Sequence, residues 1–527
     1  MNSDTASQTG IGLAEALELA IRAQQHGEID QAREIYRRIL EVWPDCPDAV
    51  HFLGLLAYQQ GDHEQAFALV EKSLVLAPDH PGFWNNQGNL HKEKGNKSEA
   101  AAAYRRSIAL QPDFADAHNN LGVMASQQGD FAAAVASYQK AISLQSDHAD
   151  AYLNFGNALE QLGLLADATL AYEARIHLRP THPEAYGRLG ILLWRQGKKE
   201  EAVEAIVANT ELDPGDTQAF LFLGHILAEQ ERNLEACEAY RKVVEISPRH
   251  TGANRMLGLT LARAGKIAES REIWSKWAEA DPANPVPRHL VQAGSDEGIP
   301  VRANDDFVVC EFDRFADSFD KNLKHLQYQA PELVAGALKK LFPDPTINTL
   351  AILDAGCGTG LCGPLVRPLA RYLEGVDLSP GMLEKAGERG GYDALIAAEL
   401  TAFMTSKNEA YEVIISADTL CYFGQLEEVS AAAAGALKPG GFFIFTVEKT
   451  PDNAVGKRVT LDPSGRYTHT EAYVRSSITR TGLVVMEISQ VFLRMEYFKP
   501  VEGLLVVLQK QPPVFPDNSS HEEGHAG

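Results

Sequence analysis

Apolar and small residues recur through the first half of the chain at the three- and four-residue spacing of amphipathic helices. Aligned with itself, this half repeats every 34 residues, as from Gly54 to Gly88. Three residue types hold this register, which predicts pairs of closely packed helices. They are glycine at Gly54, Gly88, Gly122, Gly156, Gly190, Gly224 and Gly258, alanine at Ala66, Ala100, Ala134, Ala168, Ala202 and Ala236, and proline at Pro44, Pro78, Pro112, Pro180, Pro214, Pro248 and Pro282.

Each residue type of the repeat has a steric role. Glycine and alanine let two helices approach closely, tyrosines such as Tyr104 fill the space between neighbours, and proline ends the second helix. The pattern resembles the tetratricopeptide repeat, whose period and landmarks match these residues. The resemblance implies eight units over 13–284, stacked as an all-α superhelix with a concave face. Two late units depart from the pattern, because Glu231 replaces the glycine between helices and Ser270 replaces the alanine.

Three asparagines, Asn86, Asn120 and Asn154, share one position of the first helix in consecutive units. An amide side chain both donates and accepts hydrogen bonds, so this row can hold the backbone of an extended peptide. The alternative is structural, because the same amides can bond to the neighbouring repeat. The repeats therefore predict a protein or peptide partner in the concave groove, with these asparagines as candidate contacts.

The helical period ends after Pro282, where a segment rich in proline, glycine and aspartate predicts a linker over 285–304. In the domain expected over 305–510, apolar runs alternate with helical patterns. Such alternation is typical of an α/β doubly wound sheet covered by helices on both faces. The apolar runs at 483–494 and 503–510 lie close together in sequence, which predicts an antiparallel pair at one sheet edge.

Charge and composition narrow the function classes. The formal net charge of −23 at pH 7 disfavours nucleic acid, because an acidic surface repels phosphates. No stretch approaches the roughly 20 apolar residues that cross a bilayer, and the start of the chain carries no export signal. The six cysteines are scattered without metal-ligand spacing. We expect a cytoplasmic protein with no metal centre, whose ends, 1–12 and 511–527, are disordered.

A glycine-rich run, Leu353 to Gly360, follows an apolar strand and precedes a helix, which is where a doubly wound sheet binds ligands. Gly356, Gly358 and Gly360 allow a sharp turn and let a ligand touch the main chain. Their spacing is GxGxG, whereas dinucleotide sites have GxGxxG, and this difference disfavours NAD.

Acidic residues end the next two predicted strands. The carboxylate of Asp377 can accept hydrogen bonds from both hydroxyls of a ribose, while Leu378 lies against the attached base. Glu399 ends the third strand, where an acid can accept from an exocyclic amine. Together with the glycine turn, these residues predict a pocket for adenosine that carries a group other than phosphate.

The segments LDAGCGTG, GVDLSPGML and LKPGG resemble, in order, three motifs of the class I methyltransferases that use S-adenosylmethionine. The resemblance covers about 305–510. More narrowly, FDRFADSFD, SADTLCYFG and SGRYTHTEAYV are similar to segments of predicted bacterial methyltransferases that carry tetratricopeptide repeats. The resemblance implies S-adenosylmethionine as cofactor and a Rossmann-like catalytic domain. The expected cofactor site comprises Asp354, Gly356, Cys357, Gly358, Thr359, Gly360, Asp377, Leu378, Met382, Glu399, Leu400 and Ser416.

Methyl transfer from a sulfonium mainly requires alignment of the reacting atoms, and a hydroxyl or acidic C–H acceptor also requires a base. Asp418 is one catalytic candidate, because it lies where the fourth strand delivers residues to the reaction centre. Tyr467 and His469 lie in an insertion after the fifth strand, and the ordinary pKa of histidine suits proton removal near neutrality.

Other side chains are candidates for binding the methyl acceptor. Tyr328 belongs to a set with Phe315 and Phe319 that predicts either an aromatic rim around the site or ordinary helix packing. Tyr422 follows the fourth strand. The guanidinium groups of Arg466 and Arg494 suit a carboxylate or phosphate of the substrate, or serve as structural ion-pair partners.

Three functions remain open from the sequence. The leading hypothesis is an S-adenosylmethionine-dependent methyltransferase whose repeats recruit a protein substrate or partner. The second is an O- or C-methyltransferase of small molecules or lipid precursors, whose repeats serve oligomerisation or complex docking. The third is a scaffold that binds the cofactor without turnover. Methylation of nucleic acid ranks last, because the fourth strand lacks the Asn-Pro-Pro-Tyr type of motif.

Overall fold

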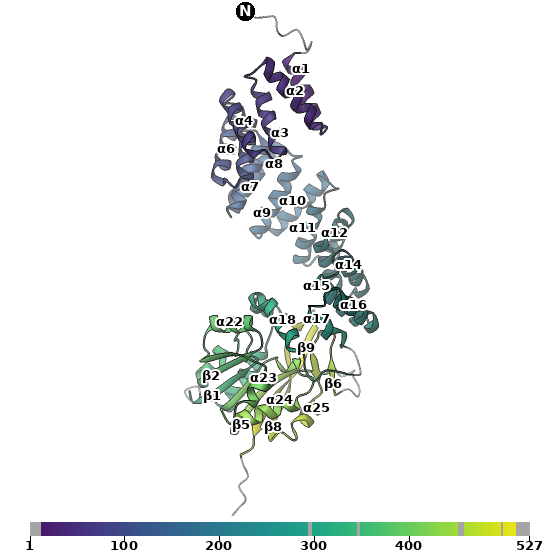
Figure 1. Cartoon of the computed structure of the whole chain (residues 1–527), viewed down its shortest axis with the longest axis vertical. Helices are drawn as coiled ribbons and strands as arrows, with labels where there is room; N and C mark the ends of the chain where they lie inside the picture. Colours follow the sequence, from purple (N-terminus) through teal and green to yellow (C-terminus); the bar gives the residue numbers. More distant parts are fainter. Residues whose placement is uncertain (1–11, 294–297, 345–347, 452–457, 497–498, 513–527) are drawn as a thin grey trace, which may run out of the picture. The chain divides into compact units, whose positions relative to one another are not determined.

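The computed structural model describes residues 12–293, 298–344, 348–451, 458–496 and 499–512. The chain divides into two compact units, residues 1–219 and 220–527, of which the first is all-helical (Figure 1). The predicted disordered ends lie almost wholly outside the described residues. No helix in the described ranges is both long enough and apolar enough to cross a membrane.

The repeats form sixteen helices over the described residues 13–280, in eight consecutive pairs, as the 34-residue period predicts. The first unit holds α1–α12, the division falls within α13, and the second unit holds α14–α16. The helices are α1 (Leu13–Gln25), α2 (Ile29–Val42), α3 (Pro47–Gln59), α4 (His63–Leu76), α5 (Pro81–Glu93), α6 (Lys97–Leu110), α7 (Ala115–Gln127), α8 (Phe131–Leu144), α9 (Ala149–Gln161), α10 (Leu165–Leu178), α11 (Pro183–Arg195), α12 (Lys199–Leu212), α13 (Thr217–Glu229), α14 (Asn233–Ile246), α15 (Thr251–Arg263) and α16 (Ile267–Ala280).

Close helix contact explains the repeated glycine. A Cβ atom added to Gly88 of α5 would lie 2.5 Å from Cε1 of Tyr104 on α6, so only glycine fits against that buried ring. The turn between the two helices of a pair also favours glycine, because one of its residues adopts a left-handed backbone conformation. Gly197 has φ +79° there, and Glu231, which replaces glycine in the seventh unit, has φ +59°. Glu231 therefore carries strain that glycine avoids.

The segment after the last repeat is packed. The expected linker over 285–304 instead contains helix α17 (Pro285–Val291), whose Val286 and Leu290 are buried. Both side chains join a hydrophobic cluster with Trp274 of α16 and with residues of the second domain. The linker prediction is therefore corrected for the residues that the structure describes, because α17 closes the core of the last repeat.

The second domain begins with helices and continues as a nine-stranded sheet. The opening helices are α18 (Asp305–Phe315), η1 (Ala316–Ser318), α19 (Phe319–His325) and α20 (Ala330–Leu341). The strands are β1 (Leu350–Ala355), β2 (Ala370–Asp377), β3 (Ala394–Ala397), β4 (Tyr411–Ser416), β5 (Leu437–Lys449), β6 (Val459–Leu461), β7 (Tyr467–His469), β8 (Leu483–Glu496) and β9 (Lys499–Lys510).

Strand order is β3-β2-β1-β4-β5, all parallel. Strand β9 then pairs antiparallel with β5 and with β8, so the predicted antiparallel pair at the edge is confirmed. Short strands β6 and β7 extend the sheet from the end of β5. The sequence did not predict these two strands, because three residues give no readable alternation.

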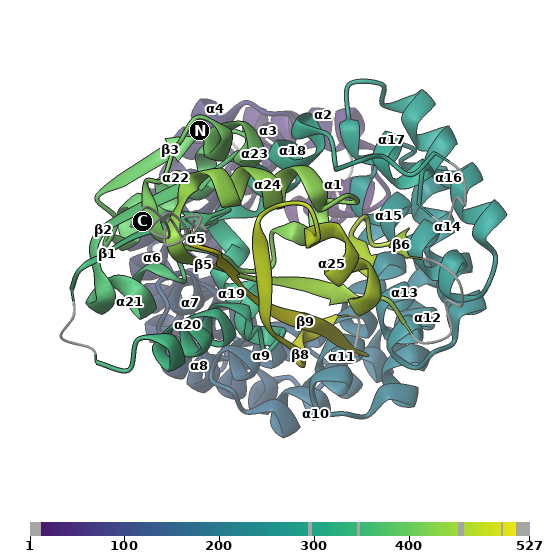
Figure 2. The same ribbon diagram turned by 90° about the horizontal axis from the view of Figure 1, so that it is seen from below.

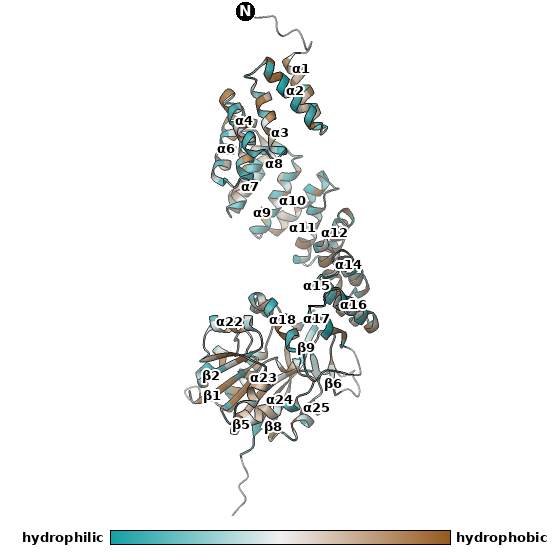
Figure 3. Cartoon of the chain, in the orientation of Figure 1, coloured by the Kyte–Doolittle hydropathy of each residue, from teal (hydrophilic) through white to brown (hydrophobic). Residues whose placement is uncertain are grey.

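Side chains alternate between two hydrophobic cores on the two faces of the sheet. Leu353 and Phe443 pack with α23 (Leu400–Thr405), α24 (Glu427–Ala436) and α25 (Glu471–Ile478) on one face. Their neighbours Ile352 and Ile444 pack with α20 and α21 (Gly363–Val366) on the other face (Figure 2). The strands are correspondingly hydrophobic along their length (Figure 3). The predicted doubly wound α/β fold is confirmed, completed by η2 (Arg367–Leu369), α22 (Pro380–Arg389) and η3 (Leu420–Tyr422).

Candidate functional site

A cavity of about 510 Å³ lies at the carboxyl ends of β1, β2 and β4, where a doubly wound sheet binds ligands. Its volume is within the range of roughly 300–1,000 Å³ that is usual for small-molecule sites. Residues of the opening helices α18 and α19 cover it, and α15 of the last repeat forms part of its wall. All of these elements belong to the unit 220–527.

The turn after β1 has the backbone that the glycine pattern predicts. Gly356 and Gly358 have φ values of +79° and +54°. A Cβ atom on Gly356 would collide with the side chain of Thr419, so this position requires glycine. A Cβ atom on Gly358 would meet nothing within 4 Å, and Gly358 lines the cavity. The turn thus exposes main chain to any ligand in the cavity.

Asp377 lies at the end of β2, directly beside this turn. Its Oδ2 accepts a hydrogen bond from the Gly358 amide at 2.9 Å, and its Oδ1 accepts from the Ser379 amide at 2.9 Å. Burial raises the pKa of the Asp377 carboxyl, and the backbone hydrogen bonds oppose that rise. Asp377, Gly356 and Gly358 all line this same cavity.

The remaining predicted cofactor residues divide into two groups. Those that line the cavity are Cys357, Thr359, Leu378, Met382, Glu399 and Leu400. Glu399 also caps α23, because its two carboxylate oxygens accept from the amides of Thr401 and Ala402 at 3.0 and 2.7 Å. The predicted contact of Glu399 with an exocyclic amine therefore competes with this capping role.

Asp354, Gly360 and Ser416 are not among the described residues that line the cavity, so their contact with the cofactor stays a prediction. Asp354 is fully buried beneath the turn, where the Tyr392 hydroxyl donates to Oδ2 at 2.6 Å. Burial raises the pKa of Asp354 to about 7. Ser416 donates to the Ala355 carbonyl at 2.8 Å, which fixes β4 beside β1. The contacts of Asp354 and Ser416 thus hold the strands beneath the turn.

Asp418 reaches the cavity from the end of β4. It adopts φ +57°, a conformation that residues other than glycine rarely have, and its amide donates to Thr446 Oγ1 at 2.8 Å. Its Oδ2 accepts from Nη1 of Arg494 at 2.7 Å, while its Oδ1 is buried and finds no hydrogen-bond partner among the residues that the structure describes. Such strain and an unsatisfied carboxylate oxygen are typical of functional positions.

Tyr467 and His469 lie on β7 and do not line the cavity. His469 is fully buried and stacks on Tyr473, with ring centroids 5.7 Å apart. Burial lowers the pKa of His469 to about 4, although backbone groups of Phe423 and Gly424 oppose the shift. Tyr467 is fully buried as well and packs in the cluster around Trp274. The geometry thus gives no support to either residue as a base.

The four predicted substrate-binding residues, Tyr328, Tyr422, Arg466 and Arg494, all line the cavity. Arg494 is buried and pairs with Asp418 at 2.7 Å, Glu496 at 2.9 Å and Glu448. Arg466 pairs with Glu496 and donates from Nε to the Tyr422 hydroxyl at 3.3 Å. Although burial opposes it, these two arginines lower the pKa of Glu496 to about 2. The structural ion-pair alternative therefore describes both arginines.

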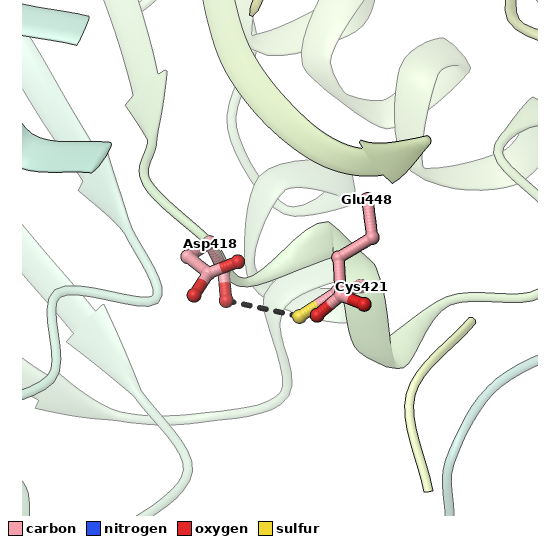
Figure 4. Close-up of side chains that lie close together, drawn as sticks. All are labelled: Asp418, Cys421 and Glu448. Carbon is pink, nitrogen blue, oxygen red and sulfur yellow. Dashed lines mark hydrogen bonds between the residues drawn. The ribbon is translucent and has the colours of Figure 1, made fainter. Parts of the chain in front are cut away.

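Asp418, Cys421 and Glu448 bring potential metal-ligand atoms within 4.8 Å of one another (Figure 4). Arg494 already pairs with both carboxylates, and Nε of Arg466 lies 3.8 Å from Glu448, so two guanidinium groups share the compensating charge. The Cys421 thiol donates to the Asp418 carbonyl at 3.1 Å, and burial raises its pKa well above the usual range. A protonated thiol and two ion-paired carboxylates favour an internal ion-pair cluster over a metal site.

Sequence reasoning missed two carboxylates that brace the site from the opening helices. Asp320 accepts from the Thr359 hydroxyl at 2.6 Å, and Asp313 accepts from the Gly381 amide at 3.1 Å. Both lie in the FDRFADSFD segment, whose likeness to known sequences was the only available signal. They tie α18 and α19 to the glycine turn and to α22.

The asparagine row of the first unit is occupied by contacts between repeats. Asn154 donates to Asn119 at 3.0 Å, Asn120 donates to Asn85 at 3.0 Å, and Asn86 lies 2.9 Å from Nε2 of His51. Each bond joins one repeat to the preceding one. These contacts favour the structural alternative over peptide capture.

Comparison with protein families separates the same two regions. The family described as tetratricopeptide repeat matches residues 17–81, 85–146, 125–183, 188–251 and 223–285. The family described as methyltransferase domain matches 353–445, which includes the glycine turn, Asp377 and Asp418.

Curated relatives match the second region. Methyltransferase-like protein 27 of Homo sapiens is 33% identical over 156 residues, which are 29% of this chain and 63% of that protein. Malonyl-[acyl-carrier protein] O-methyltransferase of Acetivibrio thermocellus is 29% identical over 133 residues, 24% of this chain and 47% of that protein. The chain thus spans less than two thirds of each of these relatives.

Solved structures resemble the repeats. YrrB, described as a TPR protein with an unusual peptide-binding site, is 24% identical and covers 35% of this chain and 95% of its own, with a TM-score of 0.32.

Proposed function

We propose that the chain is a methyltransferase with tetratricopeptide repeats, as its family matches and relatives support, and that it uses S-adenosylmethionine, bound in the cavity of the unit 220–527. One observation carries this proposal. The amide of Gly358 donates to Asp377 at 2.9 Å, and both residues line the same cavity. The exposed main chain of the turn and the carboxylate at the end of β2 therefore flank one space suited to the nucleoside half of the cofactor.

The residues present fit that cofactor. Asp377 keeps lone pairs to accept from ribose hydroxyls after serving two backbone amides. Leu378, Met382 and Leu400 supply apolar surface for the base. The open space over Gly358 admits a ligand close to the backbone. When bound, the cofactor supplies an electrophilic methyl group on a sulfonium.

The protein's own contribution to the reaction is alignment and exclusion of water. Phe315, Phe319 and Tyr328 line the cavity as the predicted rim. Asp418 is the proposed base for a hydroxyl acceptor, because Arg494 holds its Oδ2 and leaves Oδ1 to take a proton. Effective alignment of this kind supplies up to roughly 7–11 kcal/mol of the barrier.

The repeats of the first unit have a separate role in the proposal, which is to recruit a protein partner or substrate. Repeat arrays of this kind present extended surfaces for protein binding. The small-molecule alternative keeps the same cofactor site and assigns the repeats to complex docking. Direct capture by the asparagine row is not part of the proposal, because those amides join the repeats.

Calorimetry with S-adenosylhomocysteine on the full chain tests the cofactor assignment. We expect one site per chain. Gly358→Val should abolish this binding. Its matched control is Gly390→Val, which changes another glycine of positive φ (+75°) with open space around it, outside the cavity. Absence of heat from folded protein would overturn the proposal. Binding without transfer of a labelled methyl group to any acceptor, from small molecules to captured proteins, would favour the scaffold.

A further inference from the structure

The cavity has a wall that comes from a repeat. Gly252, Arg255 and Met256 of α15 line it together with residues of α18 and of the sheet. Helix α15 begins the eighth repeat, within the unit 220–527. The last repeat is thus part of the site that the family match at 353–445 only partly covers.

Helix α15, which forms this wall, and helix α17 both contact the turn before β7. Arg255 pairs with Glu311 of α18, and its Nη2 donates to the Ser464 carbonyl at 3.2 Å. His289 of α17 lies 2.8 Å from the Gly465 carbonyl. The next residue, Arg466, enters the cavity and reaches Tyr422. The last repeat is therefore braced against the chain that carries Arg466.

The lining of the cavity disfavours an anion and offers apolar surface to a ligand. Met256 lines the same cavity as Phe312 and Phe315. The arginines in the described lining all have carboxylate partners, so none is left to neutralise an anionic ligand. The pairs are Arg255–Glu311, Arg302–Asp305, Arg466–Glu496 and Arg494–Asp418.

We propose that α15 of the last repeat forms, with the aromatic residues of α18, a subsite for the apolar part of the methyl acceptor, and that this acceptor presents a hydroxyl or amine rather than a carboxylate toward Asp418. The proposal rests on the proposed function, because it places the acceptor beside the cofactor. Met256 is its specificity-determining residue. The last repeat thereby helps to shape the substrate site.

The test uses the full chain saturated with S-adenosylhomocysteine and a series of straight-chain primary alcohols, from butanol to decanol, titrated by calorimetry. Burial of each methylene should tighten binding about fourfold until the subsite is full. The matching carboxylates should bind more weakly at every chain length. An affinity that does not rise with chain length, or tighter binding of the carboxylates, would overturn the proposal.

Two substitutions at Met256 locate the effect. Met256→Trp fills the space and should weaken the longest alcohol by about tenfold or more, whereas Met256→Ala removes apolar contact and should weaken it by at least about fourfold. Both should bind S-adenosylhomocysteine as the wild type does. The control is Met486→Trp on β8, a residue 55% exposed and outside the cavity. Wild-type alcohol binding by both Met256 variants contradicts the subsite, and loss of S-adenosylhomocysteine binding by the wild type contradicts the proposed function instead.

Discussion

Removing the Asp377 carboxylate tests the proposed ribose contact. In the free protein this group serves the amides of Gly358 and Ser379, each at 2.9 Å, and lines the cavity. Hydrogen bonds to a charged acceptor contribute about 1.5–3 kcal/mol. At 1.36 kcal/mol for each factor of ten, Asp377→Ala should weaken S-adenosylhomocysteine by about 13- to 160-fold.

The assay needs a control, because the same substitution leaves two backbone amides without their acceptor. Asp393 provides it, since its Oδ2 accepts from the Leu373 amide at 2.7 Å and it lies outside the cavity. Asp393→Ala should lower the melting temperature in a similar way and leave the affinity measured by calorimetry unchanged. Equal affinities for Asp377→Ala and the wild type would refute the ribose assignment. Equal weakening by both variants would show that backbone disorder, and not the lost contact, is responsible.

Three further perturbations address the turn, the repeats and the buried acid. Gly358→Val, at φ +54° with open space above it, should abolish calorimetric binding of S-adenosylhomocysteine while the helical circular dichroism persists; retained binding contradicts the close approach. Glu231→Gly relieves a left-handed backbone that costs about 1–2 kcal/mol and loses only an exposed ion pair with Lys499, so the melting temperature should rise; a fall would contradict the strain. Asp354 has a folded pKa of about 7, above its unfolded value, so its contribution to stability is lost as the pH rises toward and through 7. The melting temperature of Asp354→Asn relative to wild type should therefore increase from pH 4 to pH 7, and a constant difference would argue against the raised pKa.

Local patterns predicted most of the fold because local forces set those parts. The 34-residue register follows from pairwise contacts such as Gly88 against Tyr104, which depend on two residues at a fixed distance in sequence. The long apolar runs became β1 and β5 because they are buried on both faces. Helix α17 was not predicted, although the sequence carries a signal for it. Asn284 caps the helix by accepting from the Val286 amide at 3.0 Å, and Pro285 occupies its first turn.

The part of the candidate site that lies at strand ends could also be predicted from the sequence. Gly358, Asp377 and Asp418 lie in motifs beside strand ends, and the strand order brings them together. His469 was misjudged because its role depends on burial, which a loop sequence does not reveal. A histidine with ordinary exposure would titrate near neutrality, whereas this one packs on Tyr473 with a pKa of about 4.

The departures of the late repeats from their own pattern mark where the array meets the α/β domain. In the eighth unit a tryptophan, Trp274, occupies the position that Tyr240 holds in the seventh. Trp274 is buried in one cluster with Leu461 and Tyr467 of the short strands. Each repeat of an array packs on its neighbours, so a terminal repeat must cover its free face with something else. Here the α/β domain covers that face, and Arg255 of the same repeat lines the cavity. In this chain, the loss of the repeat consensus in the sequence therefore indicates an interface between the last repeat and the α/β domain.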